Sequence, residues 1–214
     1  MDEDLAIITR ITKKEEIKKF LIKHKKKIYF FISLVLLTIF STFFYLDIVK
    51  KKKAEIANKF IKASINYNLK KKAYYLEEFN EIINTHDSTY APLALFFLID
   101  NKVLNSNEET NLLFDQILNN ANLEKEIKNL VIYKKALINA DFQSENIMIE
   151  ILKPIINSGS FWKPHSLLLL GDYFLFKGEK QKAKDFYSQI LASQKTNENI
   201  FNQAQQRILE NYGE

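Results

Sequence analysis

The chain contains no cysteine and is poor in glycine and proline, with four glycines and three prolines among 214 residues. The absence of cysteine excludes disulfide bonds, thiolate nucleophiles and cysteine-ligated metals, so a folded core must be stable by packing alone. So few glycines and prolines exclude a turn-rich all-β domain, whereas the content of Leu, Ile, Lys, Glu, Asn and Ala is typical of helices. The composition therefore predicts an all-α fold.

Residue patterns for catalysis are also missing. The histidines, His24, His86 and His165, lie far apart in the sequence and form no metal-binding spacing. No two glycines lie closer than seven residues, which excludes a glycine-rich phosphate loop. Adjacent carboxylates such as Glu77 and Glu78 point in different directions on a helix, so they do not share a proton. We therefore expect no catalytic residue, no metal site and no cofactor, and we expect that the protein is not an enzyme.

One long apolar run covers residues 28–46, nineteen residues without a charge, a proline or a glycine. A helix of this length spans about 28 Å, close to the thickness of the hydrocarbon core of a bilayer. A buried core helix is disfavoured because soluble cores rarely need a helix that is apolar on every face. A signal peptide is disfavoured because lysines follow the run where a cleavage site of small residues would stand. The run predicts a single transmembrane helix.

Basic residues flank the predicted transmembrane helix. Residues 1–53 hold 13 basic and 6 acidic residues and residues 54–214 hold 18 and 20, so the net charge of +5 comes from the flanks. We expect these lysines to meet anionic lipid headgroups, and we expect no nucleic-acid partner. Nine Lys or Arg precede the run and six follow it within eighteen residues, which favours a cytoplasmic N-terminus. The nearest are Lys25, Lys26 and Lys27 before the run and Lys50, Lys51, Lys52 and Lys53 after it.

Helical periodicity continues on both sides of the run. A Thr-Lys-Lys-Glu capping-box pattern predicts a helix start at Thr12, and Ile17, Phe20 and Leu21 then make residues 1–27 a basic amphipathic segment. We interpret this segment as a membrane-surface collar or, alternatively, as a docking element for another membrane protein. After the run we expect a helical stem over residues 47–88, with a helix at 71–84 whose apolar side consists of Tyr75, Phe79, Ile82 and Ile83. Residues 89–214 predict helix pairs at 90–104 with 108–119, 123–140 with 144–157, and 164–177 with 179–193, closed by a helix at 198–212.

The third pair carries the clearest motif. It resembles a tetratricopeptide repeat through Leu167, Leu170, Gly171, Phe174, Gly178, Ala183 and Tyr187. Gly171 and Ala183 would let two antiparallel helices approach closely, and the large residues would fill the groove between them. The earlier pairs match more weakly, at spacings of 35 and then 37 residues. We predict a tetratricopeptide-like α-solenoid of antiparallel helix pairs, with an array of helical hairpins that lacks this kinship as the alternative.

Phe161 and Trp162, which follow a Ser-Gly-Ser segment, are candidate partner contacts. Aromatic residues of this kind are typical of binding hot spots. The alternative is that both cap the core between the second and third pairs, with Pro164 starting the next helix.

The order of these features resembles the YfgM-type family of ancillary subunits of the SecYEG translocon. The features are the basic amphipathic start, one span directly after three lysines, the helical stem, the segment Ser-Thr-Tyr-Ala-Pro-Leu-Ala at 88–94 and the late Leu-Gly-Asp unit. The resemblance implies a bacterial inner-membrane protein with a periplasmic tetratricopeptide-like domain. It also implies a role in protein export, with translocon subunits, periplasmic chaperones or exported chains as partners. The alternatives are an envelope-assembly or cell-division scaffold that uses the same repeat surface, and a cytoplasmic domain on a helix of reversed orientation.

Overall fold

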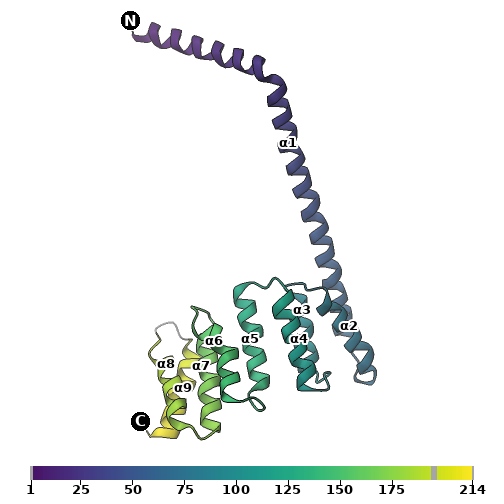
Figure 1. Cartoon of the computed structure of the whole chain (residues 1–214), viewed down its shortest axis with the longest axis vertical. Helices are drawn as coiled ribbons and strands as arrows, with labels where there is room; N and C mark the ends of the chain where they lie inside the picture. Colours follow the sequence, from purple (N-terminus) through teal and green to yellow (C-terminus); the bar gives the residue numbers. More distant parts are fainter. Residues whose placement is uncertain (1, 194–196, 214) are drawn as a thin grey trace. The chain divides into compact units, whose positions relative to one another are not determined.

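The chain folds into helices. In the computed structural model the described residues are 2–193 and 197–213, and for residues 2–17, 19, 20, 28 and 69 only the backbone is described. Within this part of the chain there are nine α-helices, one short 3-10 helix and no strand, which confirms the all-α prediction (Figure 1). The elements are α1 (Asp2–Asn66), η1 (Leu69–Lys71), α2 (Lys72–Asn84), α3 (Tyr90–Asp100), α4 (Asn107–Asn120), α5 (Lys125–Asn139), α6 (Glu145–Ile156), α7 (Lys163–Phe176), α8 (Lys180–Leu191) and α9 (Glu198–Tyr212).

α1 is a single helix of 65 residues that begins at Asp2. The predicted helix start at Thr12 is therefore wrong, because the capping-box residues lie inside α1. Acidic residues in the first turn favour the earlier start, since negative charge stabilises a helix N-terminus. No glycine or proline occurs before Pro92, so no residue of α1 interrupts its backbone hydrogen bonds. The side chains of Ile17 and Phe20, on which the predicted amphipathic collar depends, lie outside the described residues.

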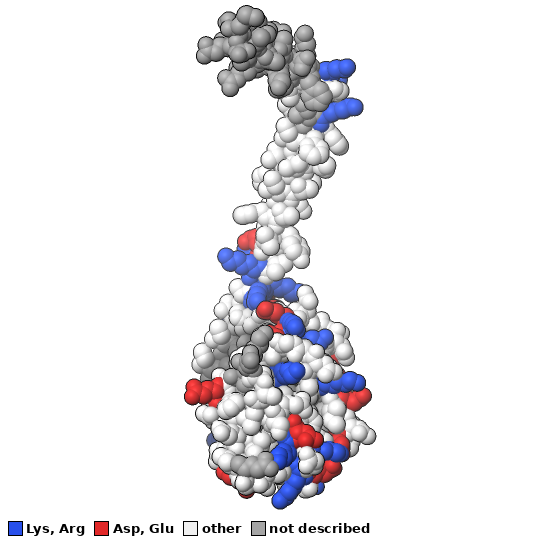
Figure 2. Space-filling view, turned by 90° about the vertical axis from the view of Figure 1, so that its left-hand side faces the viewer, with Lys and Arg blue, Asp and Glu red and all other residues white. Residues whose placement is uncertain are grey.

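α1 contains the apolar run. From Tyr29 onward it is long and apolar enough to cross a membrane, judged by length and composition. Every side chain from Tyr29 to Leu46 is exposed, so no described part of the protein covers this stretch. Thr38 and Thr42 each donate a 2.8 Å hydrogen bond to the carbonyl three residues earlier, which satisfies both hydroxyls within the helix. Figure 2 shows an uncharged length of helix with charged side chains beyond both of its ends.

Lysines flank this apolar stretch as exposed side chains. Lys51 forms a 2.8 Å ion pair with Asp47, four residues earlier on the helix. Long cationic side chains at these positions are able to reach a layer of anionic headgroups. The exposed lysines are Lys25, Lys26 and Lys27 on one side and Lys50, Lys51, Lys52 and Lys53 on the other.

The chain divides into two compact units, Met1–Glu55 and Ile56–Glu214. The core of the second unit consists of two clusters of buried apolar side chains. One cluster joins the end of α1 to α2, α3, α4 and α5, and the other joins α5 to α6, α7, α8 and α9. Val131 and Ile132 are neighbours on α5 and belong to one cluster each. α5 therefore links the two halves of the core, and residues 56–88 pack in the same unit as the later helices.

Helices of the second unit pack mainly against their neighbours in the chain, from α2 with α3 to α8 with α9, and α7 also contacts α9. The residues predicted to form the apolar side of α2 are buried, as expected from their spacing. These are Tyr75, Phe79, Ile82 and Ile83. The 3.6-residue period therefore identified the buried face of this helix correctly.

α3 ends at Asp100, whereas the sequence predicted that this helix would continue to residue 104. The side chain of Asn101 donates a 2.9 Å hydrogen bond to the carbonyl of Phe97, and Lys102 then adopts a φ of 52°, which ends the helix. Val103 turns inward, fully buried, and donates its N–H to the carbonyl of Leu98. The apolar pattern extends past the helix because this loop residue also contributes to the core.

Candidate partner-binding site

α7 and α8 pack closely through the repeat motif. A Cβ atom on Gly171 would lie 2.3 Å from Cε1 of Tyr187, so a glycine is required for this approach. Gly178 adopts a φ of 80° in the turn between the two helices, a conformation that other residues rarely adopt. The buried motif residues are Leu167, Leu170, Gly171, Phe174, Ala183 and Tyr187.

A polar network ties α9 to this helix pair. The hydroxyl of Tyr187 donates a 2.7 Å hydrogen bond to Oδ1 of Asp172, and Nε of Arg207 donates to the same oxygen at 2.9 Å. Tyr187 is fully buried, so the bond satisfies a hydroxyl that does not reach water. Burial and the hydrogen bond to Asp172 raise the pKa of Tyr187 far above its usual value. The phenol therefore remains a protonated donor.

The loop that carries Phe161 and Trp162 joins α6 to α7 and is held to α5. Glu126, in the first turn of α5, accepts a 2.7 Å hydrogen bond from Oγ of Ser160 and a 3.2 Å bond from the N–H of Phe161. The N–H of Trp162 donates to Oγ of Ser160 at 3.1 Å, and the N–H of Lys163 donates to the Ser160 carbonyl at 3.2 Å. The loop therefore has a defined conformation, with the backbone N–H groups of residues 160–163 used inside the protein.

The two aromatic residues of this loop have different surroundings. Trp162 is half-buried and stacks on Tyr133 of α5, with ring centroids 5.6 Å apart and ring planes at 25°. His165 lies beside both rings, 5.1 Å from Trp162 and 6.1 Å from Tyr133. Burial lowers the pKa of His165 below its usual value. Phe161 contacts the rings of Trp162 and His165, with centroids 5.6 Å and 5.5 Å apart, but it is 61% exposed. Trp162 thus contributes to packing between α5 and α7, whereas most of Phe161 is available to a partner.

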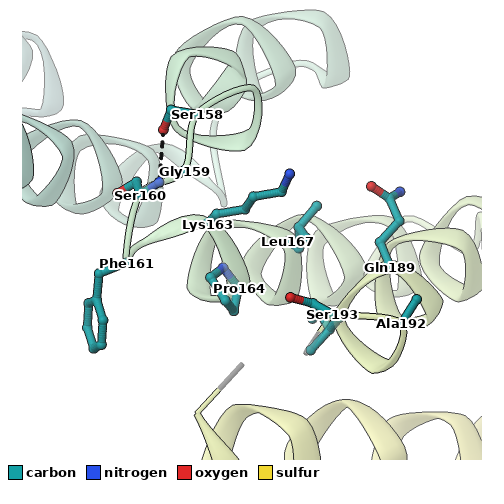
Figure 3. A pocket seen from close by; sticks show the side chains of 11 residues that line it. Ser158, Gly159, Ser160, Phe161, Lys163, Pro164, Leu167, Gln189, Ala192 and Ser193 are labelled. Carbon is teal, nitrogen blue, oxygen red and sulfur yellow. Dashed lines mark hydrogen bonds between the residues drawn. The ribbon is translucent and has the colours of Figure 1, made fainter. Parts of the chain in front are cut away.

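Phe161 borders a cavity of about 640 Å³. One wall is the α6–α7 loop from Ser158 to Phe161 and the other is the end of α8, with Lys163, Pro164 and Leu167 between them (Figure 3). A cavity of this size lies within the range of about 300–1,000 Å³ that ligand pockets occupy. The described lining combines five apolar side chains with the polar side chains of Ser158, Ser160, Gln189 and Ser193, and it has one charged group, the ammonium of Lys163. We call this cavity the Phe161 pocket.

Among the described residues, no three His, Cys, Asp or Glu side chains are grouped so that they could hold a metal ion. The Phe161 pocket is therefore the candidate site, and its residues are suited to binding a partner by apolar contact and one positive charge.

Comparison of the chain with known proteins gives no match. No protein-family model, no curated protein and no solved structure matches it. A function is therefore inferred from the sequence features and from the geometry of the site.

Sequence reasoning missed Glu126 and Lys163. Glu126 holds the loop from a position 34 residues earlier than Ser160, a contact that no local pattern reveals. The sequence contains many lysines and does not distinguish Lys163 from the others, because only the fold places this residue in a cavity. A partial signal for the loop existed, because a Ser-Gly-Ser segment before aromatic residues and a proline is typical of a surface connection.

Proposed function

We propose that the protein is a single-pass membrane protein whose helical domain binds other proteins. The observation that carries this proposal is that one chain combines a helix able to cross a membrane with a domain that has an exposed phenylalanine beside a pocket. Aromatic residues at the edge of a cavity are enriched in protein interfaces. A membrane anchor holds such a surface close to membrane and exported proteins and raises their local concentration.

The helical domain, in this proposal, is a tetratricopeptide-like α-solenoid of antiparallel helix pairs over residues 89–214. Packing between successive helices supports this arrangement. The close approach of Gly171 to Tyr187 and the turn at Gly178 are also the features that the repeat pattern requires. A stack of helix pairs buries a continuous core between neighbours and presents an extended surface to partners.

The proposed location is the bacterial inner membrane, with the N-terminus in the cytoplasm and the helical domain in the periplasm. The excess of Lys and Arg before the apolar run supports this orientation. The resemblance to the YfgM-type family supports the proposed role, which is accessory to the Sec translocon and periplasmic chaperones in protein export. The partners are then translocon subunits, chaperones or exported chains.

Crosslinking in membranes followed by affinity purification in mild detergent tests this role. The bait is the tagged 214-residue chain, and the control bait carries the same span and lysine flanks fused to an unrelated domain. We expect translocon components, periplasmic chaperones or exported chains to be enriched on the first bait alone. Enrichment of cell-division or wall-synthesis proteins would favour the envelope-assembly alternative, and equal recovery on both baits would contradict a protein-binding domain.

A further inference from the structure

We propose that the Phe161 pocket binds a segment of a partner protein in which a large apolar side chain lies close to an Asp or Glu side chain. This inference rests on the proposed protein-binding function. It identifies the binding site on the domain and the chemistry of the ligand.

The apolar part of the pocket suits a large side chain. Leu167 and Ile190 form the inner wall of the cavity and are almost fully buried, so they fix its shape but have almost no area in contact with water. Phe161 and Pro164 extend this surface toward the opening, and 61% of Phe161 is exposed. A ligand that covers Phe161 removes its exposed apolar area from water, which is the main favourable contribution to protein association. A cavity of about 640 Å³ also has room for the neighbouring residues of the bound segment.

Lys163 determines the charge of the ligand. Among the residues that the structure describes, no carboxylate lies within ion-pair distance of its ammonium group. Its side chain extends from the loop side of the pocket toward Gln189 (Figure 3). Glu126, which holds the loop, already accepts two hydrogen bonds from it. The pocket therefore presents one positive charge, on a half-buried lysine, which is complementary to a carboxylate on the ligand.

The ligand carboxylate is a side chain and not a chain terminus. Terminal carboxylates are held by several free backbone N–H groups, as at the start of a helix or in a backbone nest. Here the N–H groups of residues 160, 161, 162 and 163 all donate within the protein, and Pro164 has none. The start of α7 therefore has no cradle for a terminal carboxylate. A single ammonium group is suited to one Asp or Glu side chain.

Binding of synthetic peptides to the 214-residue chain in detergent micelles tests the proposal. The probes are short immobilised peptides that carry one Phe and one Asp near each other in a Ser-Gly background. Matched peptides replace Asp by Asn, Asp by Lys, or Phe by Ser. We expect the Asn peptide to bind about fivefold more weakly, as for a partly exposed ion pair. We expect loss of Phe to weaken binding by about tenfold or more.

Two variants connect this binding to the pocket. Phe161→Ala should lower the affinity for the Phe-Asp peptide about tenfold. Lys163→Glu should reverse the preference, so that the Lys peptide binds better than the Asp peptide. A gained preference cannot result from misfolding. The matched controls are Phe142→Ala, at a phenylalanine that is 65% exposed outside the pocket, and Lys153→Glu, at an exposed lysine of α6. Both controls should bind like the unmodified chain.

Two results would overturn the proposal. Equal binding of the Asp and Asn peptides would refute the acidic ligand, and unchanged affinity in Phe161→Ala would refute the site. The same variants in the crosslinking experiment separate this inference from the proposed function. If Phe161→Ala and Lys163→Glu capture the same partners as the unmodified chain, the pocket assignment fails while the protein-binding role stands. If the unmodified chain captures none, the role itself fails.

Discussion

Replacing Gly171 with alanine tests the packing of α7 on α8. The added methyl would lie 2.3 Å from Cε1 of Tyr187, where ordinary contact begins near 3.4 Å, so the ring must move by about 1 Å. Overpacking of this kind costs about 1–3 kcal/mol. Moving the ring also weakens its hydrogen bond to Asp172, which is worth about 1.5–3 kcal/mol for a charged acceptor. The higher helix propensity of alanine offsets about 1 kcal/mol of this loss of stability. The net loss of stability is about 3 kcal/mol.

Thermal unfolding of the 214-residue chain in detergent measures this loss. Trp162 is the only tryptophan, and it stacks on Tyr133, so its fluorescence reports on packing between α5 and α7. For a domain of this size, about 3 kcal/mol corresponds to a Tm lower by roughly 6–12 °C. Gly159→Ala is the matched control, because a Cβ atom there meets nothing within 4 Å, and its Tm should change by no more than about 2 °C. An equally small change for Gly171→Ala would refute the close approach of the two helices.

Three further predictions concern Asp172, His165 and the aromatic pair. Asp172→Ala should reduce stability by about 1.5–3 kcal/mol in chemical denaturation, because it leaves the buried hydroxyl of Tyr187 without an acceptor. Burial lowers the pKa of His165, so on acidification this imidazole is protonated in the unfolded chain at a higher pH than in the folded chain. The free energy of unfolding should therefore be highest above about pH 6.5 and should fall as the pH is lowered further. His165→Gln should remove part of this dependence in Tm measured against pH, and His86→Gln should retain it. Trp162→Ala should lower the unfolding free energy by about 2 kcal/mol through lost stacking, with partner capture by the folded fraction unchanged. Phe161→Ala should reduce partner capture and should cost less stability than Trp162→Ala, because most of the Phe161 ring is exposed although it contacts Trp162 and His165. Equal effects of the two variants on capture would contradict their different roles.

Local sequence signals were sufficient to predict much of the helical layout. The helix predicted at 198–212 is α9, Glu198–Tyr212. The side chain of Asn197 accepts a 2.8 Å hydrogen bond from the N–H of Asn199 at its start, and Gly213 adopts a left-handed conformation at its end. Where both termini carry such signals, the bounds follow from neighbouring residues alone. Thr12 shows the converse, because a capping pattern does not begin a helix when the residues before it are also helical.

It was harder to predict from the sequence which face of each helix becomes buried. Ala54, Ile61 and Ile65 recur at helical spacing, and α1 does continue to Asn66. However, Ile61 is 48% exposed and Ile65 is 77% exposed, whereas Ile56 is buried. Periodicity identifies an apolar face, but the face that becomes buried depends on where α2 and α3 pack.

The candidate site could be predicted only in part. The sequence identified an aromatic pair, but it could not assign one ring to packing and the other to the surface. That division depends on Tyr133, which supplies the stacking partner, and on Glu126, which fixes the loop. Both residues are on α5, about thirty residues away in the chain, and a contact over this distance is established by the fold alone.

The most direct test of the central claim, an exported helical domain anchored by a single span, is cysteine labelling in spheroplasts of a Gram-negative host. The natural chain has no cysteine, so single substitutions report without background. Lys26→Cys lies before the apolar run, and Phe142→Cys lies on the exposed link between α5 and α6. A membrane-impermeant maleimide should label Phe142→Cys in intact spheroplasts and should label Lys26→Cys only after the membrane is permeabilised. The reverse pattern, or labelling of both cysteines without permeabilisation, would contradict the account.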